Sequence, residues 1–327
     1  MVKGNKTYKV KSTKVAFFVV FSMFLCINLY GQDPQFTQFY ANQLYLNPAF
    51  AGTSYCPKLS LNHRNQWPGI SGSFVTTSAS YDQHVDALSG GIGLLVVNDR
   101  AGEGTLNTVS VSGIYSYELQ VTRKFTMRAG IQGTWAQKKV DWDKLTFGDQ
   151  IDPRRGFIFK TNEVQRDEPR NYVDFSAGIL GYTDKIFVGF AVHHLAQPNE
   201  SVIEGVSPLP RKYTFHAGYL IPLESKGEPA TLSPNVLVQL QEDFLQINFG
   251  MYYNKGPIYG GLWYRNKDSF IASLGFQAGI LKFGYSYDIT VSKLTNQTAG
   301  SHEFSTGLQF DCKPKKKRFR TISCPSF

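Results

Sequence analysis

Residues 281–288 read Leu-Lys-Phe-Gly-Tyr-Ser-Tyr-Asp, and this strict alternation of apolar and polar side chains decides the fold class. The four apolar side chains share one face of an extended strand and the four polar ones share the other, because successive side chains of a strand point to opposite sides. The same period of two recurs at 109–118, 244–253 and 303–310. Such alternation predicts β-strands that have one apolar and one polar face.

About fourteen such segments follow one another along the chain. Most are 9–12 residues long, the length that a tilted strand needs to cross a bilayer, whereas strands of soluble proteins are typically about 5–6 residues long. No convincing helical period separates them. The expected strands are 58–66, 73–82, 89–97, 106–118, 123–137, 171–182, 185–194, 211–221, 231–241, 244–253, 256–265, 269–277, 280–289 and 302–310.

The connections between these segments alternate in length. The links 98–105, 138–170, 195–210 and 290–301 are long and polar, whereas most of the others are short. Outer-membrane barrels have short periplasmic turns and longer external loops, and closure pairs every backbone group that lies in lipid. The sequence therefore predicts an all-β fold, an antiparallel transmembrane β-barrel of about fourteen strands over residues 58–310, integral to a bacterial outer membrane.

The first 31 residues have the pattern of a secretory signal peptide. Five lysines and no acidic residue precede the apolar run 15–29, which is followed by Tyr30-Gly31-Gln32. A basic start, a short apolar stretch and a small residue at its end are typical of an export signal. The run is about 15 residues long, shorter than the roughly 20 that a spanning helix needs. We therefore expect residues 1–31 to be removed on export.

The formal net charge of +9 is concentrated at the two ends of the chain. Residues 1–31 carry five lysines, and residues 311–327 carry six Lys or Arg against one Asp, which leaves residues 32–310 at about −1. A nucleic-acid-binding domain presents a basic face, so no nucleic-acid partner is expected.

No motif with catalytic or metal-binding spacing is present in the sequence, which lacks G-x-S-x-G, H-E-x-x-H and Walker patterns. His193 and His194 would point to opposite faces of a strand, so a shared metal is not expected. We expect no catalytic, cofactor-binding or metal-binding residues, and no cofactor. Cys312 and Cys324 could form a disulfide in an oxidising periplasm, and free or partly oxidised thiols are the alternative.

Residues 32–57 precede the barrel and are rich in aromatic residues, and the Asn47-Pro48 pair favours a turn. Two interpretations are open for this N-terminal segment. It plugs or covers the periplasmic mouth of the barrel, or it docks a periplasmic partner through Phe36, Tyr40 and Tyr45.

Residues 311–327 follow the last expected strand as a basic periplasmic tail. Such a cation run is suited to anionic headgroups, a peptidoglycan-associated surface or an acidic protein face, and a merely solvated tail is the alternative. The candidate contact residues are Lys315, Lys316, Lys317, Arg318 and Arg320.

The mature chain resembles the PorP/SprF family of type IX secretion membrane proteins. The resemblance is carried by the opening Gln32–Gly52 (QDPQFTQFY…LYLNPAFAG), by His63–Ile70 (HRNQWPGI) and by the ending Ile322–Phe327 (ISCPSF). It implies a non-enzymatic outer-membrane barrel of Bacteroidota that works with the secretion and gliding machinery in the periplasm and outer membrane. The implied client is a secreted, adhesin-like surface protein with a C-terminal sorting domain.

The expected function is therefore docking or anchoring of a secreted client by a barrel that is itself embedded in outer-membrane lipid. The main alternative is a porin for passive or ligand-specific uptake, because fourteen strands can enclose a wet lumen. The inward-facing Lys282, Asp288, Glu303 and Gln309 are compatible with that alternative. An enzyme with a site on its loops is the third hypothesis, and the absence of a nucleophile–base pair argues against it.

Overall fold

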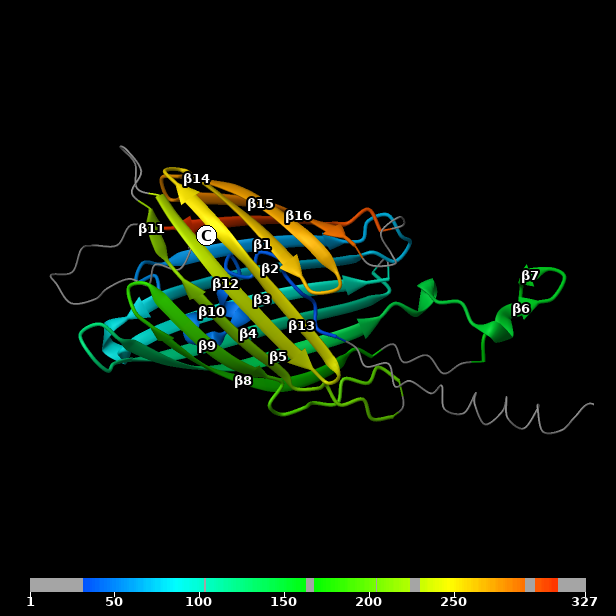
Figure 1. Ribbon diagram of the computed structural model, residues 1–327. Coiled ribbons are helices and arrows are strands. Elements are labelled where there is room, and N and C mark those ends of the chain that lie inside the picture. The colour runs from blue at the N-terminus through cyan, green and yellow to red at the C-terminus, as the bar shows by residue number, and fades with distance from the viewer. Residues whose placement is uncertain are drawn as a thin grey trace, which may run out of the picture. The chain divides into compact units, whose positions relative to one another are not determined.

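A computed structural model describes residues 32–102, 104–162, 168–203, 205–223, 230–291 and 298–310. The chain from Pro34 onward forms one compact unit, in which fourteen antiparallel strands close into a barrel (Figure 1). The barrel strands are β1 (Lys58–Gln66), β2 (Phe74–Val85), β3 (Gly90–Ala101), β4 (Leu106–Gln120), β5 (Thr126–Val140), β8 (Arg170–Tyr182), β9 (Ile186–His193), β10 (Lys212–Tyr219) with its short continuation β11 (Ile221–Leu223), β12 (Ala230–Gln241), β13 (Phe244–Lys255), β14 (Ile258–Arg265), β15 (Ser269–Ala278), β16 (Leu281–Thr290) and β17 (Ser301–Gln309).

The first and last strands close the barrel. β1 pairs with β17 along its whole length, from Lys58 opposite Gln309 to Gln66 opposite Ser301. Every other barrel strand pairs with its neighbours in chain order, and the barrel has no free edge. The predicted architecture and the strand count are confirmed.

The two faces of the sheet follow the alternation seen in the sequence. On β13 the Phe249 side chain is 52% exposed on the outer face, whereas the neighbouring Asn248 is 2% exposed inside the barrel. Large apolar residues point outward on nearly every strand, while serine, threonine and charged residues line the interior. An apolar outer band suits contact with lipid, and a polar interior is typical of outer-membrane barrels.

The barrel has two different ends. At one end, here called the turn rim, connections 86–89, 121–125, 183–185, 256–257 and 279–280 are short, and β10 ends there in its continuation β11. The strand ends Lys58 and Gln309 also lie at the turn rim. At the other end, the loop rim, lie connections 67–73, 102–105, 141–169, 194–211, 242–243, 266–268 and 291–300. The strand ends that flank the four long links expected outside all lie at the loop rim.

The remaining elements are short. They are α2 (Gln43–Leu46), the 3-10 turns η1 (Pro48–Phe50), η2 (Asp86–Leu88), η3 (Trp142–Lys144) and η4 (Gly148–Gln150), and a two-stranded hairpin of β6 (Ile151–Asp152) and β7 (Gly156–Phe157). None of the helices in the described part of the chain has the length and apolar character to cross a membrane.

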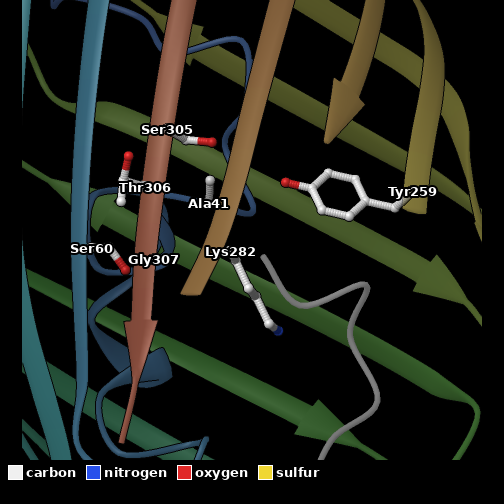
Figure 2. A pocket seen from close by; sticks show the side chains of 7 residues that line it. All are labelled: Ala41, Ser60, Tyr259, Lys282, Ser305, Thr306 and Gly307. Atoms are coloured by element: carbon white, nitrogen blue, oxygen red, sulfur yellow. The ribbon is translucent and has the colours of Figure 1, made fainter. Parts of the chain in front are cut away.

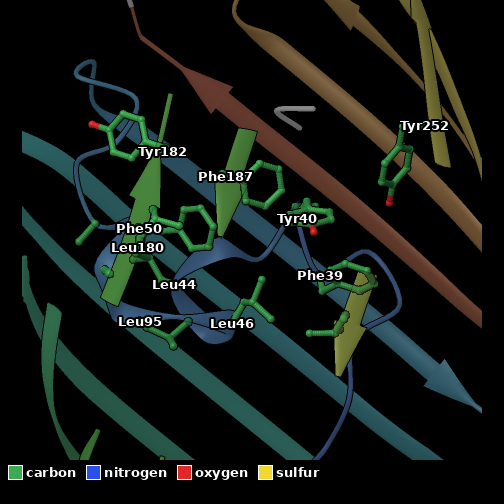
Figure 3. Packing of buried hydrophobic residues seen from close by; sticks show 14 of the residues in the cluster. Phe39, Tyr40, Leu44, Leu46, Phe50, Leu95, Leu180, Tyr182, Phe187 and Tyr252 are labelled. Atoms are coloured by element: carbon green, nitrogen blue, oxygen red, sulfur yellow. The ribbon is translucent and has the colours of Figure 1, made fainter. Parts of the chain in front are cut away.

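Residues 34–57, here called the luminal segment, run inside the barrel and include α2 and η1 (Figure 1). This segment supplies much of the buried apolar core, including Phe39, Tyr40, Leu44, Leu46 and Phe50 (Figure 3). Its residues pack against inward-facing side chains from strands on several sides of the barrel, so the core lies between the luminal segment and the wall.

Candidate functional site

A cluster of buried charges near the loop rim holds the beginning of the luminal segment. Arg64 forms ion pairs with Asp288 at 2.9 Å and with Glu303 at 3.3 Å, and all three side chains are almost fully buried. Arg265 adds a second guanidinium 3.2 Å from Asp288. Burying a charge is costly unless it is paired, and these two arginines and two carboxylates, here called the loop-rim cluster, satisfy that condition.

The luminal segment completes the loop-rim cluster with its backbone. The Thr37 and Gln38 N–H groups donate to the two carboxylate oxygens of Glu303 at 2.5 and 2.9 Å. The Thr37 hydroxyl donates to Asp288 at 2.8 Å and accepts from Arg64. Hydrogen bonds to ionised groups are among the stronger ones in proteins, so this contact fixes the segment at Thr37.

The middle of the luminal segment is held by Asn47, the residue of the predicted Asn-Pro turn. Its Oδ1 accepts from the Ala49 N–H at 2.9 Å, and its Nδ2 donates to the Ile179 carbonyl at 3.1 Å and lies 3.2 Å from His216 Nε2. The wall makes room with Gly178, where an added Cβ would lie 2.0 Å from Asn47 Oδ1.

Aromatic packing fills the space around this turn (Figure 3). Tyr40 is fully buried, and its ring lies 5.7 Å from that of Phe187 in an edge-on arrangement. Phe50 is also buried and stacks on His216 at 5.2 Å. Full burial of one such side chain contributes roughly 1.5–3 kcal/mol, so these contacts hold the segment firmly.

A second polar cluster, the turn-rim cluster, holds the end of the luminal segment. The Ala51 carbonyl accepts from Ser116 and from Arg128, both at 2.6 Å, and the Gly52 N–H donates to Asp82 at 2.8 Å. Arg128 also forms an ion pair with Glu118.

Tyr55 extends this cluster toward the turn rim. Its hydroxyl donates to Glu118 at 2.8 Å. Burial raises the pKa of the Tyr55 hydroxyl well above its usual range, and the neighbouring Glu118 carboxylate raises it further. The hydroxyl is therefore protonated at neutral pH and available as a donor.

The space left beside the segment is small. Ala41 of the luminal segment faces Ser60, Tyr259, Lys282 and residues 305–307 of the wall (Figure 2). This pocket is too narrow to admit a water molecule. On this side of the barrel, the luminal segment and the wall are in close contact.

Of the predicted partner-binding residues, only the three in the luminal segment lie in the described part of the chain. Phe36 and Tyr40 are buried inside the barrel, and Tyr45 is half-buried and lies under the Lys212 ammonium, 5.2 Å from it. Partner binding by these three residues stays a prediction. The five cations of the tail and the Cys312–Cys324 pair lie outside the described residues, whereas Cys56 is disulfide-bonded.

The residues that hold the luminal segment were not predicted as a site. Asp288 and Glu303 stood out as inward-facing charges, but Arg64, Glu118 and Arg128 were not singled out. One sequence feature could have identified them: each is a charged residue at an inward-facing position of a membrane strand, and such a charge needs a partner. Among the described residues, no group of three or more His, Cys, Asp or Glu could hold a metal ion.

Several solved structures resemble this chain in fold. The toluene transporter TodX of P. putida is 11% identical, with a TM-score of 0.45, covering 82% of this chain and 93% of that one. The toluene transporter TbuX of Ralstonia pickettii is also 11% identical, with a TM-score of 0.43 and coverage of 82% and 93%. For Omp33 of Acinetobacter baumannii the identity is 11%, the TM-score 0.43 and the coverage 79% and 100%. These likenesses concern the fold alone.

The sequence itself matches one protein family. No curated protein matches the chain. The family described as Type IX secretion system membrane protein PorP/SprF matches residues 28–308, a range that takes in the luminal segment and nearly the whole barrel. The match and the closed barrel with its apolar outer band together place the protein in the outer membrane as an integral component. This chain belongs to the PorP/SprF family of type IX secretion system membrane proteins.

Proposed function

We propose that this protein is a closed docking component of the type IX secretion machinery, which holds a secreted surface protein at the outer membrane. On this proposal it is neither an enzyme nor an open pore. Its partners are machinery proteins in the periplasm and outer membrane, and a secreted client with a C-terminal sorting domain. A role in gliding follows if the client is an adhesin.

The observation that carries this proposal is the occupied lumen. The luminal segment is fixed by the loop-rim cluster, by Asn47 and by the turn-rim cluster, and it packs an apolar core against the wall. A barrel for passive uptake needs a continuous aqueous path through its lumen. A docking component needs only a rigid barrel that carries loops, and an occupied lumen supports this second role.

The external loops offer a surface for a client. In the link between β5 and β8, Phe157 is 61% exposed, and Ile158 and Phe159 are also exposed beside the exposed cations Arg154 and Arg155. Exposed apolar residues that are grouped together often mark an interaction site. The basic tail is proposed to contact the machinery on the periplasmic side.

Surface display of the client tests the docking role. The double substitution F157S/F159S should reduce the amount of client on the cell surface while the barrel assembles normally, as judged by heat-modifiable migration on gels. The matched control V121S removes an exposed apolar side chain at the turn rim and should leave display unchanged. Equal display in both variants would argue against docking by this loop.

Conductance separates docking from the porin alternative. The wild-type protein in planar bilayers should give no large, stable open channel, because the luminal segment lies inside the barrel and packs against its wall. A stable conductance in the wild type, together with normal client display in the loop variant, would favour the porin.

A further inference from the structure

The luminal segment has a definite direction inside the barrel. Thr37 contacts Glu303 of β17, Gln38 contacts Ser305 two residues further along this strand, and Ala41 faces Gly307. Because β17 starts at the loop rim and ends at the turn rim, the stretch Thr37–Ala41 of the luminal segment runs beside it from the loop rim toward the turn rim.

The two neighbouring strands give the same direction independently. On β16, which runs the opposite way, Thr37 contacts Asp288 near the loop rim, whereas Ala41 faces Lys282 near the turn rim. On β1 the corresponding residues are Arg64 and Ser60. All three strands therefore place Thr37 closer to the loop rim than Ala41.

The residues before Thr37 also lie at the loop end of the barrel. The Pro34 carbonyl accepts from the Tyr45 hydroxyl at 2.5 Å, and the Phe36 ring packs edge-on against the Tyr45 ring at 5.1 Å. Tyr45 lies under Lys212, which is the first residue of β10 and is paired with the loop-rim residue His193.

The end of the luminal segment lies at the opposite rim. Ala51 and Gly52 are bound by Ser116, Arg128 and Asp82, which are close to the turn-rim ends of β4, β5 and β2. The Pro57 carbonyl then accepts from the Phe310 N–H at 3.0 Å, beside the seam between β1 and β17.

We infer that the luminal segment is threaded through the barrel toward the cell exterior, so that the half-buried Pro34 and Gln35 lie at the extracellular rim while Gly52–Pro57 are fixed at the periplasmic rim. The side on which each rim lies follows from the longer loops of the loop rim, since outer-membrane barrels carry long loops outside and short turns in the periplasm. A partner that reaches Pro34 and Gln35 is therefore a protein at the cell surface and not one in the periplasm. This inference is independent of the docking function.

Cysteine labelling of intact cells tests the inference with four single variants of the full chain. Q35C reports the beginning of the luminal segment and S54C its end. R154C lies in the long link at the loop rim, and K185C lies in a short turn at the turn rim, so these two exposed positions report which rim is outside. Heat-modifiable migration establishes that each variant is assembled, and the wild type gives the background from native thiols.

A membrane-impermeant maleimide should label Q35C and R154C in intact cells. It should label S54C and K185C only after the outer membrane is permeabilised. If Q35C instead behaves like K185C, or reacts only after the protein is unfolded, the threading is wrong. If R154C is protected and K185C is labelled in intact cells, the assignment of the rims is wrong.

Discussion

The loop-rim cluster gives the sharpest prediction, because R64M removes one member of a buried charge network. The Arg64 side chain is 2% exposed and makes ion pairs of 2.9 and 3.3 Å with Asp288 and Glu303. Removing one partner of a buried ion pair typically costs about 3–5 kcal/mol. We expect the lower end, about 3 kcal/mol, because Asp288 keeps Arg265 at 3.2 Å and Glu303 keeps two backbone donors.

The free energy of unfolding in urea, measured in detergent micelles, is the assay for R64M. The control is R155M, which removes an exposed arginine on the long link and should change stability by less than about 0.5 kcal/mol. The double variant R64M/E303Q removes one charge of each sign, so part of the loss should be recovered, with a coupling energy of about 0.5–3 kcal/mol.

Two results would refute the reasoning about the loop-rim cluster. One is an R64M protein as stable as R155M, which would mean that the free energy of unfolding does not depend on the ion pairs that Arg64 makes with Asp288 and Glu303. The other is a double variant whose loss equals the sum of the two single losses, which would mean that Arg64 and Glu303 are not coupled.

Three further predictions follow from the faces of the sheet and from the luminal segment. F249R places a charge on the lipid-facing side of β13 and should cost about 2–4 kcal/mol in unfolding free energy, whereas F249L should be nearly neutral; equal effects would show that this side does not face lipid. G178A puts a Cβ 2.0 Å from Asn47 Oδ1, so it should lower the assembled yield of the barrel and, in the barrels that form, loosen the luminal segment and raise conductance in planar bilayers above the wild-type level. G178A/N47A removes the clashing oxygen and should restore the assembled yield. The pKa of Tyr55 is raised in the folded state, so its hydrogen bond to Glu118 contributes its full stability at neutral pH. That contribution should decline as the pH rises beyond the ordinary tyrosine value of about 10, because Tyr55 then ionises in the unfolded chain but not in the folded one. Y55F should be less stable than the wild type at pH 7, with a difference that shrinks at high pH, and a constant difference would contradict this assignment.

The luminal position of Phe36 and Tyr40 changes how their role is tested. Both side chains are buried in contact with the barrel, so alanine at either position should lower the stability of the barrel as well as any partner binding. A partner contact at these residues requires the luminal segment to move, and display assays on such variants need a stability measurement beside them.

The amino-acid sequence alone determined the barrel, its count of about fourteen strands and, where the alternation is strict, the face that a strand turns to lipid. This was possible because a strand alternates its side chains with a period of two, so residues such as 281–288 report their own environment locally. Membrane placement was also readable, since strand length and loop length are local quantities.

The tertiary structure alone decided where residues 34–57 lie and which charges meet. A segment without a period, such as the one around Asn47-Pro48, carries no local mark of the surface against which it packs. Arg64 and Glu303 are 239 residues apart in the chain, and they meet because β1 pairs with β17 in one particular register. Barrel closure is a long-range property that sets which inward side chains face each other, and this is the physical reason why the sequence showed the charges but not their partners.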